Sequence, residues 1–136
     1  MHNLKYLEKH RIISLIITLL IAIEIFYFSS IPSFPQAPIQ GINFSVVYHI
    51  MVFFLFTFFL IITLKGKDKF RSKHLIWTVI IAIIYAISDE IHQLFVPGRF
   101  SSINDVLIDL TGMLLAILIY PKKDKDKNKK KKSKKP

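Results

Sequence analysis

The sequence has no cysteine, only 4 glycines, and no lysine or arginine between Arg11 and Lys65. Without cysteine the chain can form neither a disulfide nor a thiolate metal site, and cysteine use does not indicate a redox compartment. The sequence also lacks a nucleophile elbow, a phosphate-binding loop, a cofactor motif and internal repeats. No enzyme class is therefore indicated by a short motif. The length of 136 residues fits a single domain.

Apolar residues are in excess: they make up 52% of the chain and include 12 phenylalanines. A soluble domain of this composition would leave large apolar patches in water. The apolar residues form four stretches, each near the ~20 residues that a helix needs to cross ~30 Å of hydrocarbon. These stretches cover about residues 12–30, 44–64, 75–96 and 103–120. Because backbone amides in lipid must be satisfied within their own segment, we predict an all-α, four-transmembrane-helix bundle over residues 12–120.

The first apolar stretch resembles a signal peptide in one respect, because basic residues precede it and Ser29-Ser30 follow it. However, the stretch is long for a signal peptide, Glu24 interrupts it, and no A-x-A cleavage site follows. We expect it to be retained as a helix. Three prolines at 32, 35 and 38 end it, and Pro97-Gly98 predicts a turn before the fourth helix.

Basic residues alternate along the chain. Three precede the first stretch, none lies in the first loop, five lie in the second, one lies in the third and ten lie in the tail. This alternation predicts that both termini are cytoplasmic, with residues 1–11 as a cytoplasmic segment. The tail, residues 121–136, carries ten lysines against Asp124 and Asp126, which is +8 of the net charge of +10. We expect this tail to be disordered and to associate with anionic lipid headgroups, not with nucleic acid.

Each predicted span carries an ionisable residue near the end that this topology places outside. At ~1.5 Å of rise per residue, Glu24, His49, Asp89 and Asp109 lie about 8–10 Å deep, and the inner half of the bundle has no ionisable residue. A charged side chain inside the membrane costs roughly 2.5–3.5 kcal/mol on the insertion scale. We therefore expect these side chains to face one another, a cavity open to outside water, or a partner charge.

Helical spacing groups these residues further. Asp89, His92 and Gln93 stand at i, i+3 and i+4 and should share a face, whereas Glu90 points about 100° away, toward another neighbour. The candidate binding residues, which we expect to converge at the outer end of the bundle, are Glu24, His49, Asp89, Glu90, His92, Gln93, Arg99, Asp105 and Asp109.

The start of the fourth helix adds two expectations. Ser102-Ile103-Asn104-Asp105 reads as a capping box with Asp in place of the usual Glu, and Asp105 would also stabilise the helix dipole. Asp105 and Asp109 should share a face, and Gly112, one turn further, should let another helix approach closely.

Simpler interpretations stand beside the functional one. Arg99 would serve only as an interhelical clamp if it neutralised Asp89, Glu90 or Asp105, and His49 would be structural if it were hydrogen-bonded between helices. An enzymatic alternative uses Asp89, Glu90 and His92 as acid–base groups, with paired carboxylates whose pKa values are driven apart. A metal site is not predicted, because the Asp/Glu/His spacing matches no strong ligand pattern. A proton pathway is disfavoured because the inner half lacks ionisable residues.

One long motif resembles a known family. Residues 88–99 (SDEIHQLFVPGR), followed by Ser101-Ser102, residues 105–109 (DVLID) and Gly112, are similar to the signature of the VanZ-like membrane proteins. Residues 29–32 (SSIP) and His49 match further family positions, so the resemblance spans about residues 12–120. The sequence departs from the family where Val46 and Val47 precede His49, and where Val52 and Phe53 replace a common Glu and Tyr.

The resemblance implies a role at the cell envelope, because the family is named for a protein that gives low-level resistance to teicoplanin. Teicoplanin is a lipid-anchored glycopeptide that acts on cell-wall precursors outside the membrane. We therefore expect an envelope lipid, a cell-wall precursor or such an antibiotic to bind at the polar residues and to be held or remodelled there. We predict no cofactor, because the sequence contains no cofactor motif.

Overall fold

The computed structural model describes residues 2–32, 44–99 and 102–132, and the side chains of residues 4–32, 45–99 and 102–120. All regular structure in these residues is helical. In chain order the helices are α1 His2–Lys9, α2 Arg11–Ser29, α3 Phe44–Lys65, α4 Ser72–Gln93 and α5 Ile103–Lys132. The prolines predicted to break the chain at 35 and 38 lie outside the described residues.

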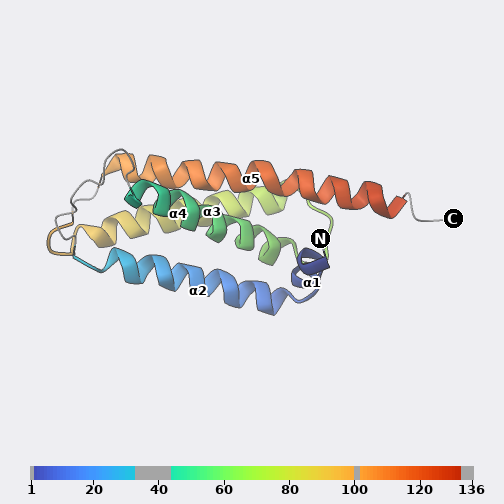
Figure 1. Ribbon diagram of the computed structural model, residues 1–136, viewed down its shortest axis with the longest axis horizontal. Helices are drawn as coiled ribbons and strands as arrows, with labels where there is room; N and C mark the ends of the chain where they lie inside the picture. The colour runs from blue at the N-terminus through green and yellow to red at the C-terminus, as the bar shows by residue number, and fades with distance from the viewer. Residues whose placement is uncertain (1, 33–43, 100–101, 133–136) are drawn as a thin grey trace.

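Four of these helices are long and apolar enough to cross a membrane: α2, α3, α4 and the part of α5 up to Tyr120. They agree with the four predicted stretches, so the predicted all-α bundle is confirmed, and the chain is a multi-pass membrane protein. Figure 1 shows the helices side by side, with both ends of the chain and the α3–α4 turn at one end of the bundle. We call this the chain-end side, and the opposite side, which carries the α4–α5 connection, the loop side.

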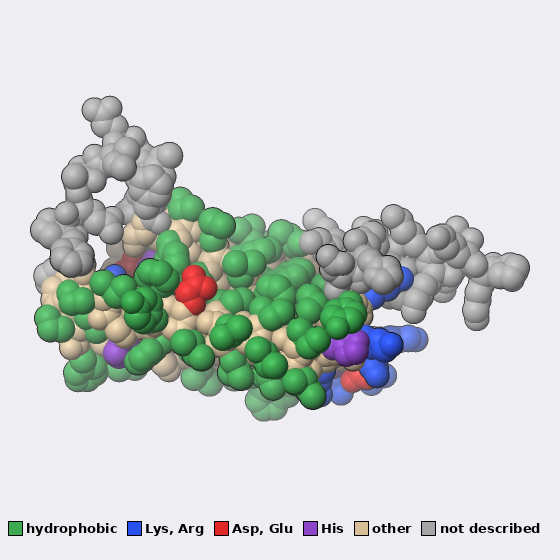
Figure 2. Space-filling view, turned by 60° about the horizontal axis from the view of Figure 1, so that its bottom comes forward, with side chains coloured by type: hydrophobic (Ala, Val, Ile, Leu, Met, Phe, Trp, Pro, Cys, Tyr) green, Lys and Arg blue, Asp and Glu red, His purple; other side chains and the backbone are tan. Residues whose placement is uncertain are grey.

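The outer surface of the bundle is apolar along its length. Large hydrophobic side chains such as Ile23, Trp77 and Leu118 are exposed on three different helices. Figure 2 shows a flank covered mainly by hydrophobic side chains, with lysine and arginine gathered at one end. Exposed apolar area of this extent fits a surface that faces lipid.

Helix α3 lies at the centre, because it packs against α1, α2, α4 and α5. Its buried Phe53 and Phe56 join Ile25 of α2 and Ala86 of α4 in the main hydrophobic cluster. Helices α3 and α5 approach each other closely at Gly112. A Cβ atom at this position would clash with the carbonyl oxygen of Ile50 and lie 3.0 Å from a backbone atom of the next turn of α3. The close approach predicted for Gly112 is thus present.

Helix α1 was not predicted. Leu4 and Leu7 of this short helix pack on a second cluster formed by Ile61, Ile62 and Tyr120 at the chain-end side. The helix therefore covers the end of the bundle. Apolar periodicity over two turns is a weak signal in sequence, because so few positions define it.

Helix α4 differs from its predicted range at both ends. It begins at Ser72, which brings His74 into its first turn, buried at 5% exposure. It ends at Gln93, where the amides of Leu94 and Phe95 bond three residues back and tighten the last turn. Asp89 is therefore four residues, or about 6 Å, from the end of α4, instead of the predicted 8–10 Å. His74 also places an ionisable residue in the chain-end half of the bundle, where none was predicted.

The tail also differs from the prediction. Helix α5 continues through Pro121 to Lys132, whereas we expected disorder from residue 121. Pro121 lacks an amide hydrogen and so removes one helical hydrogen bond. The next eleven residues, however, contain neither glycine nor another proline and are mostly lysine, which has a favourable helix propensity.

Substitution of Gly112 with alanine tests the α3–α5 contact. The new methyl group meets backbone that cannot rotate away, so Gly112→Ala should lower the free energy of unfolding by about 1–3 kcal/mol. Thermal unfolding of the detergent-solubilised protein measures this. Thr111→Ala, at an exposed neighbouring position, is the control and should change stability little. Equal effects of the two substitutions would contradict the close contact.

Candidate functional site

His49 and Asp109 form a buried pair between the two most closely packed helices. The Nδ1 atom of His49 on α3 lies 2.9 Å from the Oδ1 atom of Asp109 on α5, and Asp109 is fully buried. Gly112 stands one turn along α5 from Asp109, and Ile50, which it approaches, follows His49. The missing Cβ of Gly112 therefore brings this pair within hydrogen-bond distance.

A second group of contacts links α4 to the following turn. Pro97 and Gly98 occupy the centre of a turn closed by the amide of Arg99 on the carbonyl of Val96, and Gly98 has a φ of 77°. This geometry is that of a type II turn, in which glycine is favoured at the third position. The turn predicted at Pro97-Gly98 is present, and it directs Arg99 back toward the end of α4.

Arg99 reaches a carboxylate only through an amide. Its Nη2 group donates to Oε1 of Gln93 at 2.9 Å, and the Nε2 group of Gln93 donates to Oδ2 of Asp89 at 2.9 Å. No carboxylate among the described residues lies within ion-pair distance of Arg99. Arg99 therefore does not clamp the helices by pairing directly with a carboxylate, because its guanidinium is bound by the neutral side chain of Gln93. The guanidinium also keeps donor groups that no described residue occupies.

Glu90 points toward α5, as its offset from Asp89 predicted. Its Oε2 atom accepts a hydrogen bond of 3.0 Å from the backbone amide of Ser102. The Oγ atom of Ser102 in turn accepts from the amide of Asn104 at 3.1 Å, which caps α5. The predicted capping box is thus only half formed, because Glu90 of another helix replaces Asp105 as the acceptor for Ser102.

His92 does not share the face of Asp89. Its Nε2 atom lies 2.9 Å from the hydroxyl of Ser30, and its ring packs on Phe26 of α2 with centroids 4.4 Å apart. The reason is geometric: His92 and Gln93 are separated by about 100° around the helix, so they point to opposite sides of Asp89. Gln93 faces the buried acids and His92 faces α2.

Glu24 and Asp105 lie at the margin of the site. Glu24 is exposed, because the buried face of α2 is set by Ile21 and Ile25. Asp105 is half-buried in the first turn of α5, close enough to His49 for their charges to interact. The structure therefore brings together six of the nine predicted residues. We call these six, which are His49, Asp89, Glu90, Gln93, Arg99 and Asp109, the polar cluster.

The acids of the polar cluster act on one another, because Asp89 and Glu90 lie within electrostatic range of Asp109. It also holds buried polar atoms without a hydrogen-bond partner, among them Oδ1 of Asp89 and Oδ2 of Asp109. Buried oxygens of this kind are normally satisfied by protein, water or ligand. The cluster thus offers acceptors on its carboxylates and donors on its guanidinium.

Two tyrosines beside the cluster were missed in the sequence. The hydroxyl of Tyr48 is buried without a partner, and Tyr48 lies within electrostatic range of Asp89 and Arg99. Tyr85 donates its hydroxyl hydrogen to the carbonyl oxygen of Ala22 and so joins α4 to α2. In the sequence, the one signal for Tyr48 is its position directly before His49, which was already a candidate residue.

The described residues contain no group of three or more His, Asp or Glu side chains arranged to hold a metal ion. The acids are instead distributed over separate contacts with His49, Gln93 and the amide of Ser102.

The sequence model of the VanZ/LLP1 family matches residues 4–123. The chain belongs to this family. No curated protein and no solved structure matches it. Val52 and Phe53, which the resemblance led us to expect as departures from the family pattern, lie in the hydrophobic core, at 4% and 0% exposure. In this member the layer next to His49 is therefore apolar.

A pair of substitutions tests whether His49 and Asp109 depend on each other. Removal of the imidazole in His49→Leu leaves a buried carboxyl without a partner and should cost about 3–5 kcal/mol of stability. The double variant His49→Leu/Asp109→Leu removes both polar groups and should be more stable than His49→Leu alone. Chemical or thermal unfolding in detergent measures both. A double variant that is less stable than His49→Leu alone would show that the pair is not coupled.

Proposed function

We propose that this VanZ-family protein binds the headgroup of an envelope lipid or lipid-linked cell-wall precursor at the polar cluster. The observation that carries the proposal is that Asp89 and Asp109 each keep a buried oxygen without a partner, while the guanidinium of Arg99, which Gln93 joins to Asp89, keeps unoccupied donors. A headgroup with a phosphate and an amine, amide or sugar hydroxyl supplies both missing kinds of partner.

Each part of such a headgroup has a matching group in the cluster. Arg99 is half-buried and bonded to Gln93 through Nη2, so the rest of its planar fork suits a phosphate. The free oxygens of Asp89 and Asp109 would accept hydrogen bonds from the amine or hydroxyls. A ligand bound in this way lowers the cost of burying the acids, because a buried polar atom without a partner is unfavourable.

The distribution of basic residues supports an orientation for this site. The chain-end side carries Lys5, Lys9 and Arg11, five basic residues around the α3–α4 turn, and the lysines of α5, whereas the loop side has only Arg99. By the positive-inside rule we infer that the chain-end side is cytoplasmic and that the protein is in the cell membrane. The polar cluster would then open to the outer leaflet.

This position would also allow contact with a lipid-anchored glycopeptide, and low-level resistance of the teicoplanin type is the corresponding cellular role that we propose. The enzymatic alternative would use Asp89 and Glu90 as acid and base. It has less support, because His92, its third group, is turned toward α2.

Native mass spectrometry of protein extracted with its lipids tests the proposal. Wild-type protein should carry a co-purifying phosphorus-containing lipid. Asp89→Asn and Arg99→Lys should each weaken its retention by about tenfold or more, because each removes a charge-assisted hydrogen-bonding geometry.

The matched control is Asp126→Asn, which makes the same chemical change in the part of α5 beyond the apolar span, at the other end of the bundle. It should leave retention of this lipid unchanged. The proposal fails if no lipid is retained by the wild type, or if all three variants lose it to the same extent.

A further inference from the structure

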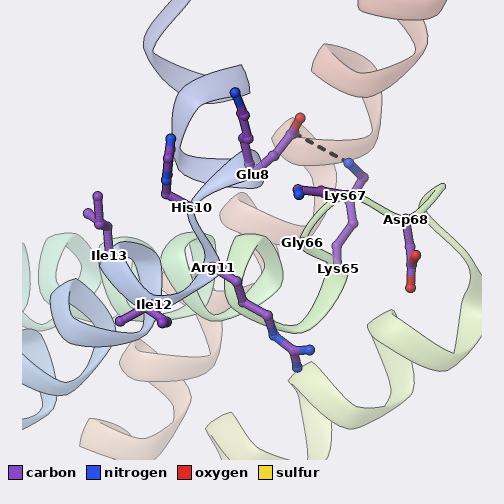
Figure 3. A pocket seen from close by; sticks show the side chains of 10 residues that line it. Glu8, His10, Arg11, Ile12, Ile13, Lys65, Gly66, Lys67 and Asp68 are labelled. Carbon is purple, nitrogen blue, oxygen red and sulfur yellow. Dashed lines mark ion pairs between the residues drawn. The ribbon is translucent and has the colours of Figure 1, made fainter.

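The chain-end side has a pocket that the proposed function does not use. It has a volume of about 470 Å³ and lies between the α1–α2 junction and the α3–α4 turn. Figure 3 shows side chains from α1, α2 and the turn around it, with the ion pair of Glu8 and Lys65 as a dashed line. The helix ends that line this pocket lie at the opposite end of the bundle from the α4–α5 connection (Figure 1), next to which Gln93 and Arg99 of the polar cluster lie.

The backbone creates the pocket at two points. His10 has φ −107° and ψ 72°, which breaks the helix and separates α1 from α2. Gly66 has a φ of 54° and ends α3 in the left-handed conformation typical of a helix C-terminus. The chain therefore turns at Gly66 toward Arg11, whose Cδ atom is 3.6 Å from where a Cβ of residue 66 would stand.

Positive charge dominates the lining. Lys9, Arg11, Lys65 and Lys67 face Glu8 and Asp68, which leaves a formal charge of +2. Glu8 is bound at 3.4 Å by Lys65 and at 2.9 Å by the hydroxyl of Tyr120. That carboxylate already has partners within the fold.

The remaining cations are available. Lys9, Arg11 and Lys67 are exposed, and no described carboxylate forms an ion pair with any of them. Three cations around one concave surface repel one another, and an anion in the pocket would relieve that repulsion.

The N-terminus of α2 adds to this positive field. Its first turn has no acidic residue, and no side chain caps it. The amides of Ile13 and Ser14 bond to the carbonyl of His10, whereas no described residue accepts from the amides of Arg11 and Ile12. Because α2 is 19 residues long and its first amides are free, its N-terminus attracts anions.

We propose that this pocket binds a phosphate group, through the Arg11 guanidinium, the Lys9 and Lys67 ammonium groups and the free amides of α2. The guanidinium fork matches two phosphate oxygens, and the ammonium groups balance the charge. The phosphate could belong to an anionic lipid headgroup or to a soluble phosphate compound, because the pocket lies at the end of the apolar spans. The two sources are separated by experiment.

The test compares thermal stabilisation of the full chain in maltoside detergent by two probes, inorganic phosphate and phosphatidylglycerol in mixed micelles, with chloride at equal ionic strength as reference. Wild-type protein should be stabilised by at least one probe, since a ligand that binds the native state raises its stability. The variant Arg11→Gln/Lys67→Gln should require about tenfold or more of the same probe for equal stabilisation.

Lys129→Gln/Lys130→Gln, which removes the same charge from the tail, is the matched control and should respond like the wild type. A response to phosphatidylglycerol alone assigns the phosphate to a lipid, and a response to inorganic phosphate assigns it to a soluble compound. Absence of stabilisation in the wild type overturns the proposal. So does an equal loss in the pocket and tail variants, because it would show that only net charge matters.

Discussion

The contact between α3 and α5 at Gly112 determines where the buried acids can find partners. Because a side chain at Gly112 would clash with the backbone of α3, only glycine allows the two helices this approach. The approach places Asp109 against His49, and α3 then serves as the central helix on which α2 and α4 also pack. The positions of the other acids follow from this arrangement, since Glu90 reaches the start of α5 and Asp89 reaches Gln93.

The acids in these helices are costly, at roughly 2.5–3.5 kcal/mol for each charged side chain on the insertion scale. A fold that needed only stability would satisfy every oxygen or replace the acids with apolar residues. In this structure one oxygen of each of two aspartates is satisfied, and the other is buried without a partner. Under the proposed function, a headgroup that supplies donors would satisfy these two oxygens.

Much of this architecture could be predicted from the sequence because lipid imposes a simple constraint. Apolar stretches of the right length predicted all four spans, and a small residue one turn from an acid predicted the close approach at Gly112. The direction of Glu90 followed from helical geometry alone.

The features that could not be predicted from the sequence depend on contacts between helices. Ser102 took its capping partner from another helix, and His92 turned toward Ser30 because the neighbour on that side is α2. Glu24 is exposed because Ile21 and Ile25 set the buried face of its helix. Helix α1 is defined by its contacts with Ile61 and Tyr120, which no local pattern indicates.

The proposed function requires that the polar cluster face the outside of the cell, and cysteine labelling tests this most directly because the chain has no cysteine of its own. Asn104 and Lys67 are exposed at opposite ends of the bundle. In intact cells a membrane-impermeant maleimide should label Asn104→Cys, and it should label Lys67→Cys only after the membrane is permeabilised. The reverse pattern would place the polar cluster in the cytoplasm and contradict the account.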